Sequence, residues 1–544
     1  MRRLQSLRDR CLAFMGHPAA LAAAAERLTV RGAHAEAAPL LARAARAGMP
    51  VAQRRLGRAY LFGEGLPSSP AEALRWLSRA AVKGDTEART LLATLALQGL
   101  SDERTPGVFD TAITMGGAAP DYVRAAFWAH QAGQGGSAEA MAILAHVKSA
   151  GPATLRDPEA ARYLYRRSAE LGWPRGQLGH ALALMERGGP STAAQTLLRA
   201  AAGAGLPSAH YMLGVLAETG AVGAPDFATA ARHFGAGAVL GHPPSQQRHG
   251  LCLLLGRGVP ADPFKGESWL RRAAVAGEPL AAALLGDLYI RDGALPPNPV
   301  EAATWFRRAA EAGHGGAARA LGQMFLTGAG MSPDPREAAH WLRTAVDHGE
   351  PAAWDDLHRL RDTRQLTGPD LDGTVAWCLA RAKTGEPAAS YAIGRFLAEG
   401  IGVPRDDRGA LLWFLRAADQ VTEALFWCGR ILIEGNGVPS YPDLARACYL
   451  KAANSGVSAA AAAAGEMMLN GKGGVADPVR ARELFSRAAA ASHPGAIYAL
   501  GILAAGGHGT PPDQAAAIAY FKRAAVMGHP VAGLMLNRLM PVAA

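Results

Sequence analysis

The chain has 544 residues, of which 49% are hydrophobic and 19% are charged, so it can bury a large core and is not disordered as a whole. Aromatic residues make up only 6%, fewer than a large β-sandwich or β-barrel normally uses. The net charge of +10 comes mostly from arginine, and so modest an excess permits an acidic partner without requiring one.

The N-terminal segment predicts no targeting or membrane signal. Arg8, Asp9 and Arg10 interrupt its only short apolar run, so the apolar region of a secretory signal peptide is missing. No stretch along the chain reaches the roughly 18 apolar residues of a membrane-spanning helix. We therefore expect a cytoplasmic protein. The five cysteines are odd in number and form no CxxC, which argues against a disulfide framework and a zinc site.

A glycine that closes an alanine-rich, helix-like segment recurs along the chain. The step between Gly205 and Gly385 is 36 residues five times in succession, and the register continues through Gln420, Gly456, Ser492 and Gly528. The earlier members of this column are Gly48, Gly84, Gly133 and Gly172.

Two further columns keep the same register. A small residue follows the repeat glycine by nine positions, at Gly57, Gly214, Gly250, Gly286, Gly322, Gly394, Gly429, Gly465 and Gly501. An aromatic residue precedes it by about eight, at Trp76, Trp269, Trp305, Trp341, Trp377, Trp413 and Tyr520. Because glycine is unfavourable inside a helix, its recurrence predicts close approach of a second helix, with the aromatic residue lying over the gap.

The segment from Glu278 to Gly313 shows the pattern of one repeat. Pro279 suits a first helical turn, and apolar residues at i, i+3 and i+4 spacing follow it up to Tyr289. This first helix, helix A, ends near Gly293. Asn298 is expected to cap helix B, which Gly313 closes in the left-handed conformation.

Neither helix of such a pair can bury its apolar stripe alone, whereas stacked pairs can. The sequence therefore predicts an all-α fold, an α-solenoid superhelix of about 14 antiparallel helix pairs of about 36 residues each. We expect N-terminal repeats over 1–99, an irregular insertion over 100–121 and the main array over 122–544.

Two places depart from the repeat. Roughly thirteen extra residues, rich in proline and glycine, lie between Ser101 and Tyr122. The unit at 350–385 begins with a charged helix and lacks both the usual glycine and the GxG connector. Both departures are compatible with sequence drift, since loop insertions cost little. The alternative, which is less favoured, is that both are local devices that bend the superhelix or hold a partner.

The pattern PxAAxxLGxxYxxGxGVxxDxxxAxxWxxxAAxxG resembles the Sel1-like repeat, a relative of the tetratricopeptide repeat. The clearest matches are Pro387–Val403, Gly205–Gly220 and Ala302–Gly313, and the resemblance extends from about Gly16 to Gly528. It implies antiparallel helix pairs in a superhelix that serves as an adaptor or scaffold for protein complexes. In bacteria it points to envelope, exopolysaccharide, secretion, signalling or host-interaction systems, without choosing among them.

One branch of this family is secreted and joins helix A to helix B by a disulfide in each repeat. Cys428 lies in helix A, but the matching end of helix B, at Lys451, Ala452 and Ala453, has no cysteine. This departure argues against the disulfide branch.

No catalytic or ligand-binding constellation stands out. Histidines that follow the repeat glycine, such as His242 and His314, are most simply turn residues. The segment Asn470–Gly474 lacks the spacing and preceding strand of a P-loop. Cys378 and Cys428 are expected to pack as small apolar residues. We expect no metal, no cofactor and no enzymatic activity.

A basic column lies about five residues before the repeat glycine. Its members are Arg43, Arg79, Arg167, Arg272, Arg308, Arg416, Lys451, Arg487 and Arg523. Stacked repeats would align them as a ladder that could bind an acidic peptide, an anionic polymer or a membrane surface. The alternative is that each cation complements the C-terminal end of its own helix.

These features predict a non-enzymatic scaffold that grips a protein partner on the concave surface, as a monomer or in a partner-dependent complex. The alternative is binding of single-stranded nucleic acid or an anionic polymer along the basic column. Nucleic acid is less favoured, because the helix ends carry alanines such as Ala273 and Ala274 rather than base-reading polar residues. An enzyme site assembled across several repeats has no support in the sequence.

Overall fold

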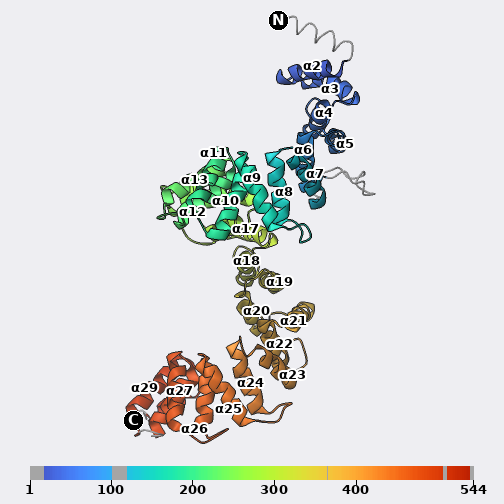
Figure 1. Ribbon diagram of the computed structural model, residues 1–544. Coiled ribbons are helices and arrows are strands. Elements are labelled where there is room, and N and C mark those ends of the chain that lie inside the picture. The colour runs from blue at the N-terminus through green and yellow to red at the C-terminus, as the bar shows by residue number, and fades with distance from the viewer. Residues whose placement is uncertain (1–16, 101–118, 294, 364, 507–510, 540–544) are drawn as a thin grey trace. The chain divides into compact units, whose positions relative to one another are not determined.

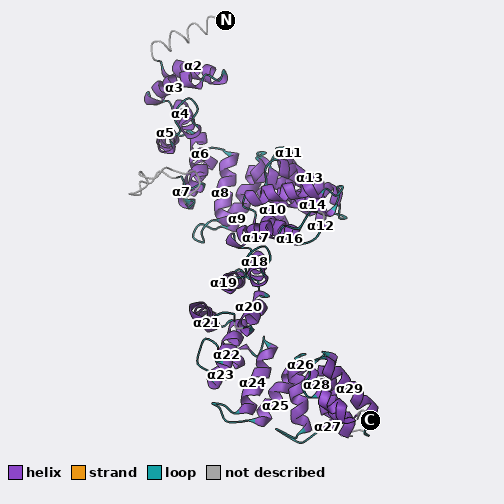
Figure 2. Cartoon of the chain, turned by 180° about the vertical axis from the view of Figure 1, so that it is seen from behind, coloured by secondary structure: helices purple, strands orange, loops and turns teal. Residues whose placement is uncertain are grey.

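A computed structural model describes residues 17–100, 119–293, 295–363, 365–506 and 511–539. The chain divides into two compact units, unit 1 up to Pro297 and unit 2 from Asn298. Helices joined by short connections form both units, and the described residues contain no strand (Figure 2).

Unit 1 alternates the two helices of the predicted repeat. Its A helices are α2 (Pro18–Val30), α4 (Pro50–Phe62), α6 (Thr86–Leu97), α8 (Ala138–Ala150), α10 (Pro174–Gly188), α12 (Pro207–Thr219), α14 (Pro243–Leu255) and α16 (Pro279–Ile290). Its B helices are α3 (His34–Arg46), α5 (Pro70–Val82), α7 (Tyr122–Gln134), α9 (Pro158–Glu170), α11 (Thr192–Gly203), α13 (Phe227–Val239) and α15 (Pro263–Val275).

Unit 2 continues the alternation. Its B helices are α17 (Pro299–Glu311), α19 (Pro335–Asp347), α21 (Gly368–Lys383), α23 (Asp407–Ala417), α25 (Pro442–Asn454), α27 (Pro478–Ala490) and α29 (Gln514–Val526). Its A helices are α18 (Gly315–Thr327), α20 (Ala353–Asp362), α22 (Pro387–Glu399), α24 (Thr422–Glu434), α26 (Ser458–Leu469), α28 (Pro494–Gly506) and α30 (Ala532–Leu539).

Apart from α20 and α21, consecutive helices stack on one another within each unit, as the run from α24 to α29 illustrates (Figure 1). With α16 and α17 counted as one pair along the sequence, the helices make 14 pairs followed by α30. The predicted all-α solenoid is therefore confirmed. Residues 101–118 of the predicted insertion lie outside the described residues, and the boundaries 1–99, 100–121 and 122–544 stay a prediction. The division after Pro297 was not foreseen.

Helix B begins where the capping signals place it. The side chain of Asn298 accepts a hydrogen bond from the backbone N–H of Glu301 at 3.2 Å. Asp262 and Asp477 do the same for α15 and α27, at 3.0 Å each. A proline follows each of these caps at the first helical position, where its missing N–H costs no hydrogen bond.

The repeat glycine ends helix B in the left-handed conformation. Gly313 has φ +90°, and the N–H of His314 reaches back to the carbonyl of Ala309 at 3.0 Å. This hydrogen bond satisfies a carbonyl that the helix leaves open. Ser492 stands in the same column and keeps φ +60° without being glycine, so the repeat geometry outweighs the preference of the residue there.

The glycine inside helix A marks the close approach of helix B. A Cβ on Gly394 would lie 2.6 Å from Cε1 of Phe414, and one on Gly501 would lie 2.7 Å from Cε1 of Phe521. The prediction that the tryptophan column covers this gap was wrong by one residue. Trp341 instead lies beside the gap and donates its indole N–H to Glu337 at 3.1 Å, because one step along a helix turns a side chain by about 100°.

We predict that Gly394→Ala destabilises the protein by about 1–3 kcal/mol, because the added methyl group overlaps the Phe414 ring. Urea unfolding followed by circular dichroism measures the change. Gly533→Ala in α30 is the matched control, since its Cβ meets open space and alanine favours the helix by up to ~1 kcal/mol. Equal effects of the two substitutions would contradict the close packing of α22 on α23.

Candidate interaction surface

The predicted basic column lies on the B helices, and several of its members cover a tryptophan. The guanidinium carbon is 4.6–6.0 Å from the indole centroid in the pairs Arg79–Trp76, Arg272–Trp269, Arg308–Trp305 and Arg416–Trp413. Such cation–π contacts at partly exposed sites contribute about 0.5–1 kcal/mol each.

Other members of the column bond to neighbouring groups. Arg487 donates to the carbonyl of Ala453 at 2.6 Å, and Arg523 donates to the carbonyl of Ala489 at 3.0 Å. Both acceptors lie at the end of the preceding B helix, so each arginine caps its predecessor. Arg167 pairs with Glu170 at 2.6 Å, and the side chain of Lys451 is exposed. The role of this column in partner binding stays a prediction.

Unit 1 contains a groove with a volume of about 570 Å³ between its A helices α8, α10 and α12. Its apolar lining includes Leu97, Ile143, Trp173, Leu178, Leu182 and Leu206. The volume falls in the range of pockets that enclose a ligand or an inserted side chain. The sequence pattern did not indicate this groove, because its walls come from several successive repeats rather than from one.

A few polar groups are set into this apolar lining. Burial raises the pKa of the Glu139 carboxyl above its ordinary value, and the charge of Arg175 opposes part of this rise. Burial likewise raises the pKa of Tyr165. His146 also lines the groove. The groove therefore combines apolar area with a few groups that can orient a bound chain.

The charged unit at 350–385 places polar residues where its neighbours have apolar ones. Asp356 stands 36 residues from both Ala320 and Ala392, and it is 1% exposed. Arg319 and Gln323 on α18 donate to its carboxylate at 2.6 and 2.9 Å. A buried carboxylate thus ties α20 to α18.

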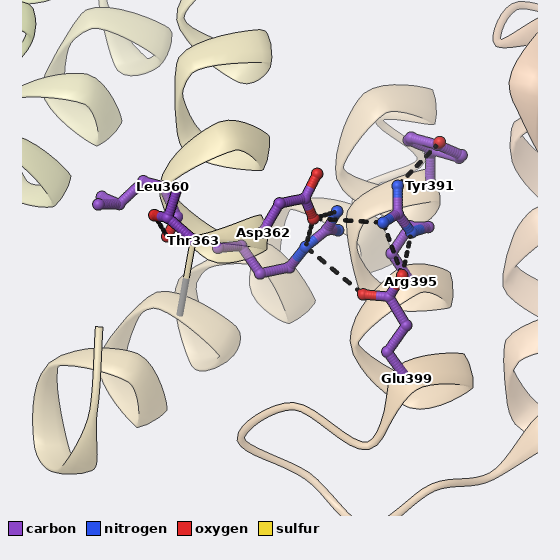
Figure 3. Close-up of polar contacts among 7 residues, drawn as sticks. Leu360, Asp362, Thr363, Tyr391, Arg395 and Glu399 are labelled. Carbon is purple, nitrogen blue, oxygen red and sulfur yellow. Dashed lines mark hydrogen bonds and ion pairs between the residues drawn. The ribbon is translucent and has the colours of Figure 1, made fainter. Parts of the chain in front are cut away.

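A second charged group ties α20 to α22 (Figure 3). Arg395 on α22 contacts Asp362 at 3.3 Å and Glu399 at 2.6 Å. Buried Arg361 pairs with Asp362 and lies 3.8 Å from Glu399. We call these four side chains the α20–α22 latch.

His358 is largely buried beside this latch. Burial lowers its pKa to about 3, and the charges of Arg361 and Arg395 add to the effect, while Asp362 acts against it. The imidazole is therefore neutral in the folded protein at physiological pH. Its ring lies 5.4 Å from that of Tyr391, which is another contact between α20 and α22.

We predict that this histidine makes the protein less stable in acid. Below about pH 6.5 the unfolded chain binds a proton at His358 and the folded chain does not, so stability falls as the pH drops toward about 3. At about pH 4.5, which is ~2 pH units below the ordinary histidine pKa, the loss is about 2.7 kcal/mol. Urea unfolding at several pH values should show a shallower pH dependence for His358→Leu than for the natural chain. Parallel curves would contradict the assignment.

The expectations for metal ligands, reactive thiols and a phosphate-binding loop can be compared with the described residues. No three His, Cys, Asp or Glu side chains among them converge to hold a metal ion. Burial raises the pKa of both Cys378 and Cys428 to about 12, so these thiols are protonated and poorly nucleophilic at neutral pH. The Asn470–Gly474 segment is the connector between α26 and α27. Among the described helices, none combines the length and apolar character needed to cross a membrane.

The Sel1 repeat family model matches the chain in eleven segments. They are residues 50–85, 114–137, 138–173, 207–242, 243–277, 279–314, 316–350, 387–421, 422–457, 458–493 and 494–529. The matched residues cover well over half of the chain, and residues 351–386, which include nearly all of the charged unit, lie between two matched segments. No curated protein matches the chain.

Similar solved structures include bacterial repeat proteins. A protective antigen of uropathogenic Escherichia coli with an SLR fold is 22% identical, with 93% of this chain and 97% of that chain covered and a TM-score of 0.44. A Sel1 repeat protein from Oxalobacter formigenes is 26% identical, with 63% and 89% covered and a TM-score of 0.40.

Proposed function

The chain belongs to the Sel1 repeat family, and from this premise we propose that it is a non-enzymatic scaffold that binds a protein partner through the A helices of unit 1. Members of this family generally act as protein-interaction scaffolds. A bacterial envelope, exopolysaccharide, secretion or signalling system is the setting that we propose for it.

The groove between α8, α10 and α12 is the observation that carries this proposal. Leu182 lines it and is 41% exposed although it is strongly apolar. An apolar side chain of the partner would bury this surface and gain about 25 cal/mol for each Å² removed from water. Glu139 and Arg175 at the same groove can pair with main-chain or charged groups of the partner.

Site-specific photo-crosslinking in cells tests where the partner binds. We expect a crosslinker at Leu182 to trap one defined protein, and a crosslinker at Val239 to trap none. Val239 is a suitable control because it is 77% exposed on α13 and does not line the groove. Equal adducts at the two positions, or none at Leu182, would contradict the proposal.

We predict that Leu182→Lys weakens binding of the trapped partner about tenfold or more, since it places a charge in the apolar lining. Titration of the purified partner measures the affinity. Leu240→Lys, which changes an exposed leucine at the end of α13, should leave the affinity unchanged. A larger loss of affinity for Leu240→Lys than for Leu182→Lys would indicate that the partner binds the B helices instead.

Binding of single-stranded nucleic acid or an anionic polymer along the basic column is the second candidate. Its support is weaker, because Arg487 and Arg523 already bond to helix ends and Arg272 covers Trp269. A gel shift with homopolymer RNA at several salt concentrations distinguishes it, since binding through phosphates would weaken steeply with salt.

A further inference from the structure

The helix pair α20/α21 exchanges large and small residues relative to its neighbours. His358 on α20 stands 36 residues from Gly322 and Gly394, where helix A elsewhere has the glycine that receives helix B. Cys378 on α21 stands 36 residues from Leu342 and Phe414, the side chains that fill that gap. The large residue has moved to helix A and the small one to helix B.

The helices α20 and α21, which carry this exchange, pack on each other less than the neighbouring helix pairs do. The helices α18 and α19 pack along their lengths, as do α22 and α23, whereas α20 and α21 do not. Trp354 on α20 meets Trp377 on α21 with ring centroids 5.2 Å apart, and its indole N–H bonds to Glu386 at 3.1 Å. The helix α20 is also only 10 residues long.

The helix α20 buries Ala353, Trp354, Leu357 and Leu360, and charged contacts take the place of the packing that it lacks against α21. Asp356 joins α20 to α18, and the α20–α22 latch joins it to α22. The carboxylate of Asp362 in this latch is half exposed and reached by water, whereas the side chains of Arg361 and Arg395 are 2% and 15% exposed. Nη1 of Arg361 and Nε2 of His358 are buried without a hydrogen-bond partner, which further favours a hydrated, open arrangement.

We propose that α20 is a movable segment within unit 2, which the α20–α22 latch closes and which opens without unfolding the helices on either side. A helix that lacks packing against its pair partner opens locally at lower free energy than fully packed neighbours. The unit at 350–385 then has a mechanical purpose, as a joint at which α17–α19 can shift relative to α22–α29. This inference does not depend on the proposed partner or groove.

Hydrogen exchange of the full-length protein, followed by mass spectrometry, tests the joint. In Asp362→Asn we expect the amides of residues 353–362 to exchange at least tenfold faster than in the natural chain, with α24–α29 unchanged. Raising the salt concentration should accelerate the same amides in the natural chain, because screening weakens the latch.

Glu434→Gln is the matched control. Glu434 occupies the position of Glu399 in the next repeat and bonds to Arg430 at 2.9 Å, but α24 packs fully on α25. We expect this substitution to leave exchange in α24 unchanged. Unaltered exchange in Asp362→Asn, or acceleration spread evenly over unit 2, would overturn the proposal.

A variant that restores the usual side-chain sizes at positions 358 and 378 provides an independent test. The double variant His358→Gly/Cys378→Leu should slow exchange in α20, since it recreates the pairing of α18 with α19. Faster exchange in a folded double variant would overturn the role of the exchanged pair. If the double variant does not fold, Asp362→Asn alone decides.

Discussion

Asp356→Ala is expected to destabilise the protein by about 2–4 kcal/mol, although it restores the alanine that neighbouring repeats carry. The substitution leaves Arg319 and Gln323 without the carboxylate to which both donate. Breaking a fully buried ion pair costs about 3–5 kcal/mol, and we place this case lower because the side chain of Arg319 is 30% exposed and can reach water.

Urea unfolding of the full-length chain, followed by circular dichroism, measures this change. Asp355→Ala alters the exposed neighbouring carboxylate and should shift the free energy of unfolding by less than ~0.5 kcal/mol. The comparison also separates the two explanations of the charged unit. If Asp356 arose by drift, a return to alanine should stabilise the protein, and that result would contradict its role in joining α18 to α20.

Phe414→Ala is expected to cost about 3–5 kcal/mol, because this ring is fully buried and fills the gap left by Gly394. The ring also lies 5.7 Å from that of Trp427 and 5.8 Å from that of Tyr391, so its removal leaves a cavity shared by α22, α23 and α24. Large cavities cost the most when surrounding helices cannot collapse into them.

The same urea experiment should show almost no change for Leu412→Ala. Leu412 lies two residues earlier on α23 and is 59% exposed, so its removal creates no cavity. A loss below ~1 kcal/mol for Phe414→Ala would mean that α23 does not insert this ring into α22.

The repeat register and the helix ends could be predicted because they depend on local chemistry. The Asn298 cap and the left-handed Gly313 act within a few residues of the backbone, so the sequence alone reveals them. The sequence predicts that Trp341 covers the gap in helix A, whereas the next residue, Leu342, fills it. The tryptophan is conspicuous in the sequence, but the direction of its side chain depends on how α18 and α19 face each other.

The charged contacts of α20 could not be predicted for a different reason. Arg319 and Asp356 are 37 residues apart, and Arg395 and Asp362 are 33 apart, so neither pair lies within one repeat. Periodicity marked the unit as unusual without showing which residues meet. The groove of unit 1 was missed in the same way, since Ile143, Leu178 and Leu206 come from three repeats.

The arginines that bond to the preceding B helix give the array a direction. Arg487 completes the end of α25, and Arg523 completes the end of α27, so in this part of the array a module finishes the one before it. A gene duplication that appends a module at the C-terminal side therefore supplies its own cap for the old end. Loss of the terminal module removes that cap and leaves the carbonyls at the end of the preceding B helix open.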